Sequence, residues 1–160
     1  MIVISNFALD FIYSDRSVFK DVVMDEAWSL LAGAQGKALV NKLVRAGRAM
    51  NAGVDIVTQN ADDVGDEKMK NNIGLKFAFR STDIVEIKKI LTFFGLDPED
   101  EDNQKKIKGL ENGECLFQDL YGRTAVIYID PGFNWLFDAL DTRPPQRVEE
   151  ELILDEADVE

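Results

Sequence analysis

The feature that most restricts the fold of this chain is the alternation of short apolar runs with helical patterns. Apolar and β-branched runs bounded by turn residues predict strands at residues 2–8, 20–25, 54–59, 75–80, 114–119 and 124–130. Helical patterns separate the second, third and fourth of these runs. Such alternation favours an α/β fold, a mostly parallel sheet flanked by helices on both faces. Ligands of such a sheet bind at the carboxyl ends of its strands.

Three helices and a hairpin complete the predicted fold. Residues 34–50 repeat apolar side chains with the period of a helix that lies on a sheet, and a more polar helix is expected at 62–72. Thr82 or Asp83 can cap a third helix, which Gly95 ends. Two β-rich runs around the short loop that contains Gly122 predict an antiparallel hairpin at the sheet's edge.

The end of the chain has a different composition. Residues 133–140 predict a short helix, and two prolines then open a segment in which residues 148–160 hold seven acids and no base. We therefore expect a folded domain over 1–143 and an acidic, flexible tail over 144–160. The formal net charge is -12, and without the tail the chain is only mildly acidic, so direct nucleic-acid binding is not expected.

Composition also excludes several kinds of chemistry. The sequence has no histidine and one cysteine, Cys115, which rules out histidine acid–base catalysis, a Cys/His zinc site and an internal disulfide. No apolar run is long enough to span a bilayer, and the N-terminus lacks the layout of a secretory signal. We expect a soluble protein of the cytoplasm.

Two adjacent carboxylates, Asp25 and Glu26, follow the apolar strand predicted at 20–25. This is the Walker B arrangement of P-loop ATPases. In that setting Asp25 would hold Mg²⁺, usually through a water, because this ion prefers oxygen ligands and keeps several waters. Glu26 would orient and deprotonate the water that attacks the γ-phosphate of ATP. The alternative is that the two acids merely begin a helix, where negative charge suits the helix dipole.

Arg45 and Arg48 in the next helix, and Thr58-Gln59 at the end of the next strand, complete a pattern. The pattern resembles that of the additional-strand P-loop ATPases, which include conjugation ATPases of the TraC and TrsE kind and, more distantly, HerA/FtsK translocases. The resemblance covers roughly residues 1–143 and is specific only over 22–59. It implies half of a RecA-like P-loop NTPase domain.

The resemblance also implies roles for these residues. Arg45 and Arg48 are three apart and project from one side of a helix, so either could act as an arginine finger on a neighbouring subunit. Gln59 has a donor and an acceptor and could sense the γ-phosphate. The alternatives are a solvated basic edge for the arginines and a plain turn residue for Gln59. Thr58 is expected to be structural support.

A phosphate-binding loop is missing from the sequence. No G-x-x-x-x-G-K-[ST] motif occurs, and the stretch from Gly33 to Ala38 lacks both its spacing and its hydroxyl. Because only 24 residues precede Asp25, we expect a C-terminal fragment or a truncated gene product that cannot hydrolyse ATP alone.

The resulting hypothesis is an ATPase fragment of a conjugative type IV secretion machine. With the missing half it would bind ATP and Mg²⁺, form a homo-oligomer with a hexamer as one option, and meet secretion components at the inner face of the cell membrane. The alternatives are a fragment of a HerA/FtsK-like DNA translocase and a catalytically silent interaction module.

Three weaker signals have plain explanations. The acids from Asp97 to Asp102 predict a solvated loop, and Cys115 predicts a buried, inert thiol. Core packing or edge cover is the simplest explanation of the aromatic residues Trp28, Phe133, Trp135 and Phe137.

Overall fold

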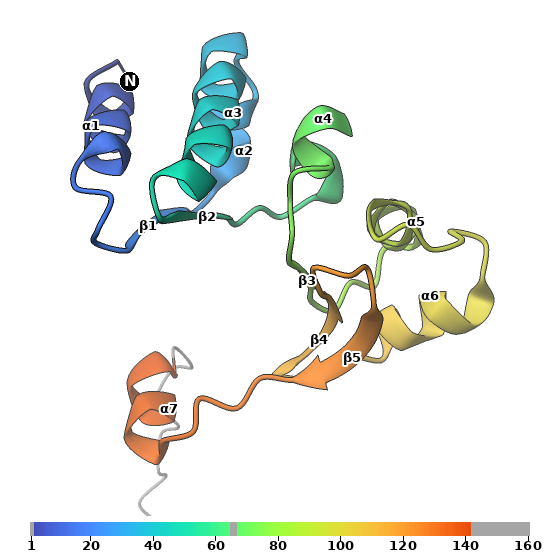
Figure 1. The fold of residues 1–160 in the computed structure, drawn as a ribbon. Coiled ribbons are helices and arrows are strands. Elements are labelled where there is room, and N and C mark those ends of the chain that lie inside the picture. The colour runs from blue at the N-terminus through green and yellow to red at the C-terminus, as the bar shows by residue number, and fades with distance from the viewer. Residues whose placement is uncertain (1, 65–66, 142–160) are drawn as a thin grey trace, which may run out of the picture. The chain divides into compact units, whose positions relative to one another are not determined.

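The structure, a computed structural model, describes residues 2–64 and 67–141. The chain divides into two units, Met1–Ile129 and Asp130–Glu160, and each is considered by itself. The first unit contains a parallel pair of strands and a three-stranded antiparallel sheet (Figure 1). No helix in the described ranges is long and apolar enough to cross a bilayer.

The first part of the larger unit is a helix followed by a strand–helix–strand arrangement. In chain order it comprises α1 (Ile2–Tyr13), β1 (Lys20–Met24), α2 (Ala27–Leu31), α3 (Ala34–Ala49) and β2 (Ala52–Ile56). β1 and β2 pair in parallel, with Met24 opposite Ile56 at their carboxyl ends. The strand predicted at 20–25 is confirmed, and the one predicted at 54–59 begins and ends earlier.

The strand predicted at residues 2–8 is wrong, because these residues open α1. Their β-branched composition favours a strand locally, but Ala8 and Ile12 are spaced as on one helical face. Ile12 is fully buried against Leu43 and Ala46 of α3, and Ala8 packs beside them. Burial of this face against α3 outweighs the local β preference, which is strongly dependent on context.

α3 lies on one face of the parallel pair, as its apolar period predicted. Leu43 and Ala46 form a buried cluster against which Val22 of β1 and Val54 of β2 pack. A Cβ at Gly47 would lie 2.7 Å from the carbonyl oxygen of Ala52, closer than such atoms approach. Glycine at this position therefore lets α3 come close to the start of β2.

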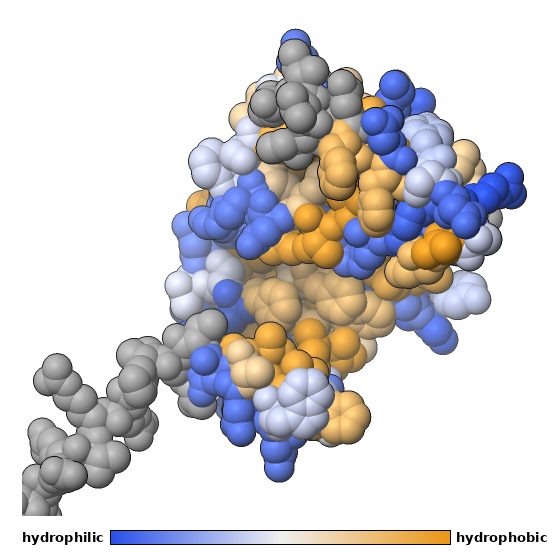
Figure 2. All heavy atoms as spheres, turned by 90° about the vertical axis from the view of Figure 1, so that its left-hand side faces the viewer, coloured by the Kyte–Doolittle hydropathy of each residue, from blue (hydrophilic) through white to orange (hydrophobic). Residues whose placement is uncertain are grey.

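The opposite face of the parallel pair is open to solvent. Val23, which alternation turns away from α3, is 61% exposed, and Asp55 lies opposite it in the register. Asp55 is exposed, yet partial desolvation, followed by repulsion from Asp21, raises its pKa. Figure 2 shows apolar side chains at the surface on the side of the molecule where α1 lies. Among the described residues of this unit the pair is thus covered on one face, whereas most parallel sheets are covered on both.

The second part of the larger unit is built on the antiparallel sheet. It comprises η1 (Ala61–Val64), α4 (Glu67–Lys70), β3 (Lys76–Ala78), α5 (Ile84–Phe93), α6 (Glu101–Lys108), β4 (Glu114–Gln118) and β5 (Thr124–Tyr128). The predicted hairpin of β4 and β5 is confirmed. The expectation of a mostly parallel sheet is wrong, because β3 pairs antiparallel with β4. Phe77 and Phe117 contact across that pair with ring centroids 4.9 Å apart, which stabilises it.

α5 and α6 cover one face of the antiparallel sheet. Ile87, Leu91 and Ile107 are almost fully buried and form a core with Leu116 of β4. The side chain of Asp83 accepts hydrogen bonds from two backbone N–H groups at the start of α5, which confirms the predicted cap. Ile84, in the first turn of this helix, is half exposed.

Two other helix predictions need correction. The acid cluster is not simply a solvated loop: Asp100 caps α6, and Glu101 and Asp102 form its first turn, where acids suit the helix dipole. The single helix predicted over 62–72 is divided between η1 and α4, with residues 65–66 outside the described ranges.

The smaller unit contains α7 (Asn134–Leu140), which confirms the short helix predicted there. Phe133 and Trp135 stack with ring centroids 6.1 Å apart. Both rings and that of Phe137 are at least half exposed, so core packing does not explain them and edge cover stays a prediction. The acidic tail predicted at 144–160 lies outside the described residues, and the partition at residue 143 stays a prediction.

Candidate functional site

The predicted site residues follow the carboxyl ends of two paired strands. Asp25 and Glu26 come directly after β1, and Gln59 comes three residues after β2. Backbone hydrogen bonds continue the ladder beyond the strands: Val57 N–H donates to Met24 O over 2.9 Å, and Ala27 N–H donates to Val57 O over 3.0 Å. These bonds hold the two segments side by side at one edge of the sheet.

Glu26 has an uncommon backbone conformation. Its φ of 52° and ψ of 41° lie in the left-handed region, which non-glycine residues rarely occupy and which costs free energy. The turn is held by Asp25 Oδ1, which accepts from Glu26 N–H over 2.9 Å. Glu26 O in turn accepts from the N–H and the hydroxyl of Ser29, over 3.2 and 3.1 Å.

The carboxylate of Glu26 contacts Gln59, 33 residues further along the chain. Gln59 Nε2 donates to Glu26 Oε1 over 2.9 Å and to Oε2 over 3.2 Å. The indole Nε1 of Trp28 also donates to Glu26 Oε2. All three side chains are exposed, and so is Asp25. The sequence prediction that the acid pair and Gln59 meet at one edge of the sheet agrees with this geometry.

The helix-start explanation of the two acids accounts for only part of this arrangement. α2 does begin at Ala27, directly after Glu26. However, the side chain of Glu26 makes no capping hydrogen bond to the helix. Its oxygens are instead bonded to Gln59 and Trp28, so the glutamate is oriented toward the end of β2.

The loop that carries Gln59 is fixed by Asp63. Asp63 Oδ2 accepts from Thr58 Oγ1 over 3.2 Å and from Asn60 Nδ2 over 3.0 Å. The two donors flank Gln59, which limits the positions that the glutamine can take. Thr58 therefore supports the loop. The role of its partner Asp63 was missed in the sequence, where the only sign of it is an acid four residues after the glutamine.

Arg45 lies away from the acid pair within one chain. Arg45 is exposed on α3, two residues before Gly47. Gly47 lies close to Ala52, the first residue of β2, so this part of α3 is near the start of β2, whereas the acid pair is near its end. Arg48 belongs to α3, and its side chain lies outside what the structure describes. One chain thus brings Asp25, Glu26 and Gln59 together and does not bring Arg45 to them.

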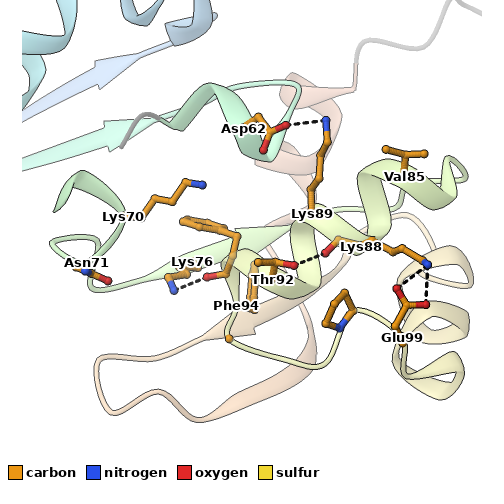
Figure 3. Close-up of a pocket in the computed structure, with 13 residues that line it drawn as sticks. Asp62, Lys70, Asn71, Lys76, Val85, Lys88, Lys89, Thr92, Phe94 and Glu99 are labelled. Carbon is orange, nitrogen blue, oxygen red and sulfur yellow. Dashed lines mark hydrogen bonds and ion pairs between the residues drawn. The ribbon is translucent and has the colours of Figure 1, made fainter. Parts of the chain in front are cut away.

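A pocket of about 570 Å³ lies elsewhere, on α5 (Figure 3). Ion pairs of 2.7 Å join Lys88 to Glu99 and Lys89 to Asp62 along its wall. Lys76 Nζ donates to Phe93 O over 2.7 Å, and burial lowers the pKa of this lysine. The acid pair and Gln59 do not line this pocket, so it is separate from the candidate site.

Adjacent carboxylates after one parallel strand, facing a glutamine after the next, are the arrangement of an NTPase-type α/β domain. Residues 1–140 match the AAA-like domain, and the chain belongs to that family. Domains of this family are nucleotide-binding domains. The resemblance predicted from the acid pair, the arginines and Gln59 is thereby confirmed at the level of the family.

Similar proteins agree with this assignment. Over 119 residues the chain is 33% identical to the uncharacterized protein YddE of Bacillus subtilis (strain 168). This match covers 74% of the chain and 14% of YddE. VirB4 of Thermoanaerobacter pseudethanolicus has a similar structure, with a TM-score of 0.65 and 21% identity over 79% of this chain and 35% of that one. The chain therefore spans a minor part of the length of both relatives.

A viral protein shares the fold as well. The genome packaging NTPase B204 of Sulfolobus turreted icosahedral virus 2, in complex with ATP-gammaS, matches with a TM-score of 0.61 and 15% identity. The match covers 82% of this chain and 65% of B204. At this identity the likeness concerns the fold alone.

Proposed function

We propose that this chain is the Walker B part of an ATP-hydrolysing domain that powers a type IV secretion machine. The observation on which this depends is the hydrogen-bonded pair of Glu26 and Gln59, placed beside Asp25 at the carboxyl ends of two parallel strands. Membership of the AAA-like family and the fold shared with VirB4 support the proposal.

The donor set fits Mg²⁺ and a triphosphate. Two adjacent, exposed carboxylates offer the oxygen ligands that this ion prefers, and exposure leaves room for the waters that it keeps. Asp25 would hold the ion. Bound Mg²⁺ supplies positive charge that neutralises the phosphates of the nucleotide.

Glu26 and Gln59 would act on the attacking water. The carboxylate of Glu26 would accept a proton of that water while the water oxygen bonds to the γ-phosphorus. The bond from this phosphorus to the bridging oxygen would break, so that ADP and inorganic phosphate leave. Gln59 has one donor and one acceptor group, so its amide can exchange between the Glu26 carboxylate and a phosphate or water oxygen. This exchange would report whether the γ-phosphate is present.

An arginine would come from a second subunit. Because Arg45 lies near the start of β2, it does not meet the acid pair of its own chain. A finger from Arg45 would then act between copies, which requires a homo-oligomer. Arg48 is the other candidate, and its side chain lies outside what the structure describes. The sequence of this chain has no phosphate-binding loop, so the nucleotide would be held together with a further part of the protein. This chain by itself would not hydrolyse ATP.

The test of the acid uses the protein expressed from its full reading frame. Glu26→Gln should lower kcat at least about 100-fold, because general-base catalysis is lost, while the Kd for ATP stays within about threefold. Glu99→Gln is the matched control, since Glu99 is an exposed glutamate paired with Lys88 outside the site. Wild-type turnover in Glu26→Gln would contradict the proposed role.

The shared site is tested by mixing two inactive variants. Arg45→Ala or Arg48→Ala should lower kcat on the order of 10³-fold if that residue is the finger. A mixture with Glu26→Gln should regain activity, because an intact Glu26 of one copy meets an intact arginine of the other. A mixture that stays inactive at every ratio would oppose a finger between subunits.

A further inference from the structure

We propose that Trp28 is a positioning residue, whose indole N–H holds the Glu26 carboxylate in place opposite the Gln59 amide. The catalytic part of this inference rests on the proposed function, whereas the contact itself can be tested in the 160-residue chain.

Packing does not explain where Trp28 lies. Its neighbours Ala27 and Leu31 are the residues by which α2 is buried, and they pack with Val40 and Met69. Trp28 is 48% exposed and takes no part in that cluster. An indole has a single donor and no acceptor, and here that donor is given to Glu26 Oε2. The most specific contact of this side chain is therefore with the site.

The left-handed backbone of Glu26 makes the contact possible. Residues two apart on a regular helix point in different directions and do not meet. Here α2 begins only at Ala27, and the φ of 52° at Glu26 reverses the chain before the helix starts. The carboxylate of Glu26 and the ring of Trp28 consequently face each other across that turn.

Two neutral donors on one carboxylate have a chemical consequence. Gln59 Nε2 lies nearer to Oε1, and Trp28 Nε1 donates to Oε2, so each oxygen has its own donor. Hydrogen bonds to both oxygens restrict the rotation of the carboxylate and fix its orientation. Neither donor adds positive charge, and the indole offers no acceptor that could compete for the proton of the attacking water.

Tryptophan emission tests the contact directly. The chain has two tryptophans, so Trp135→Phe leaves Trp28 as the only emitter, and Trp135 is exposed on α7. Glu26→Ala removes the carboxylate that accepts from the indole, so the emission of Trp28 at pH 7 should change in wavelength and intensity. Circular dichroism of both chains shows whether the variant is still folded.

Glu99→Ala in the same background is the matched control. It removes an exposed carboxylate outside the site, so the emission of Trp28 should stay that of the Trp135→Phe chain. An emission that Glu26→Ala leaves unchanged would overturn the contact. An equal change in Glu99→Ala would overturn it as well, because the effect would then not be specific to Glu26.

Turnover of the protein expressed from its full reading frame tests the positioning role. Trp28→Phe keeps the ring and removes the donor, so kcat should fall about tenfold with an unchanged KM. A merely structural role would lower the amount of folded protein and leave kcat and KM of the folded fraction unchanged. Trp135→Phe should leave both quantities unchanged.

The two proposals fail in distinguishable ways. If Glu26→Gln abolishes turnover and Trp28→Phe leaves kcat unchanged, the positioning role is overturned and the ATPase proposal stands. If Glu26→Ala changes the emission of Trp28 but Glu26→Gln turns over ATP at the normal rate, the contact stands and the catalytic role of the pair is overturned.

Discussion

Replacing Gly47 by alanine should destabilise the chain although alanine is the better helix former. On α3 the new methyl would lie 2.7 Å from the carbonyl oxygen of Ala52, where ordinary contact begins at about 3.4 Å. The helix must move outward by several tenths of an ångström, and overpacking of this kind costs about 1–3 kcal/mol. The gain in helix propensity offsets about 1 kcal/mol of that cost.

The net expectation is a loss of about 0–2 kcal/mol, centred on about 1 kcal/mol, in the free energy of unfolding. Urea denaturation followed by circular dichroism measures this loss, and the midpoint should fall while the slope stays constant. Gly33→Ala is the control, because a Cβ at Gly33 meets nothing within 4 Å and its φ of -101° suits alanine. A Gly47→Ala chain that gains the full helix propensity, about 1 kcal/mol, over the wild type would refute the close approach of α3 to β2.

Three further predictions concern the second part of the larger unit. Asp100→Ala removes the cap of α6 and should lower the free energy of unfolding, measured by urea denaturation, by about 1 kcal/mol. Glu101→Ala, one residue later, is the control and should lower it by less. Burial alone would raise the pKa of Asp119, but hydrogen bonds from Arg123 and Tyr121 outweigh it and lower the pKa. The stability that this carboxylate adds is present above its unfolded pKa and is lost as the pH falls through the folded value, so wild type and Asp119→Asn should converge in thermal melts below about pH 4. Cys115 is fully buried and burial raises its pKa, so a thiol reagent should label it only at the rate of unfolding, and rapid labelling in the absence of denaturant would contradict the fold.

The sequence predicts local elements well where one signal dominates. β1, β4, β5, α3 and α5 form where alternation, helical period or a capping Asp83 indicated them. α1 was missed because its β-branched first residues locally favour a strand. Its helical form depends on the burial of Ile12 against Leu43 and Ala46 of α3, which lie more than 30 residues further along the chain. α6 was missed because four consecutive acids suggest a loop, although Asp100 caps a helix there and Ile107 anchors it.

Sheet pairing could not be predicted in full. The pattern of strands and helices does not say whether a third strand joins the parallel pair or another sheet. The pairing of β3 with β4 depends on contacts such as that of Phe77 with Phe117, which join residues far apart in the chain. Nothing in the short run at 76–78 identifies this partner.

The candidate site was predictable in composition and only partly in geometry. The order of Asp25, Glu26 and Gln59 along strand ends was sufficient to expect them at one edge of the sheet, since parallel strands end together. The contact of Trp28 with Glu26 was not predictable, because it depends on a left-handed φ that a glutamate rarely adopts. The distance of Arg45 from the acid pair became clear only from the contact of Gly47 with Ala52.

Position 26 requires both a left-handed backbone conformation and a carboxylate side chain. Glycine or asparagine would adopt its left-handed conformation at a smaller conformational cost than glutamate does. Neither could present a carboxylate to Gln59 and Trp28. Selection of this chain for higher thermal stability would therefore favour glycine or asparagine at position 26. Each such substitution would remove the acid from the end of the strand.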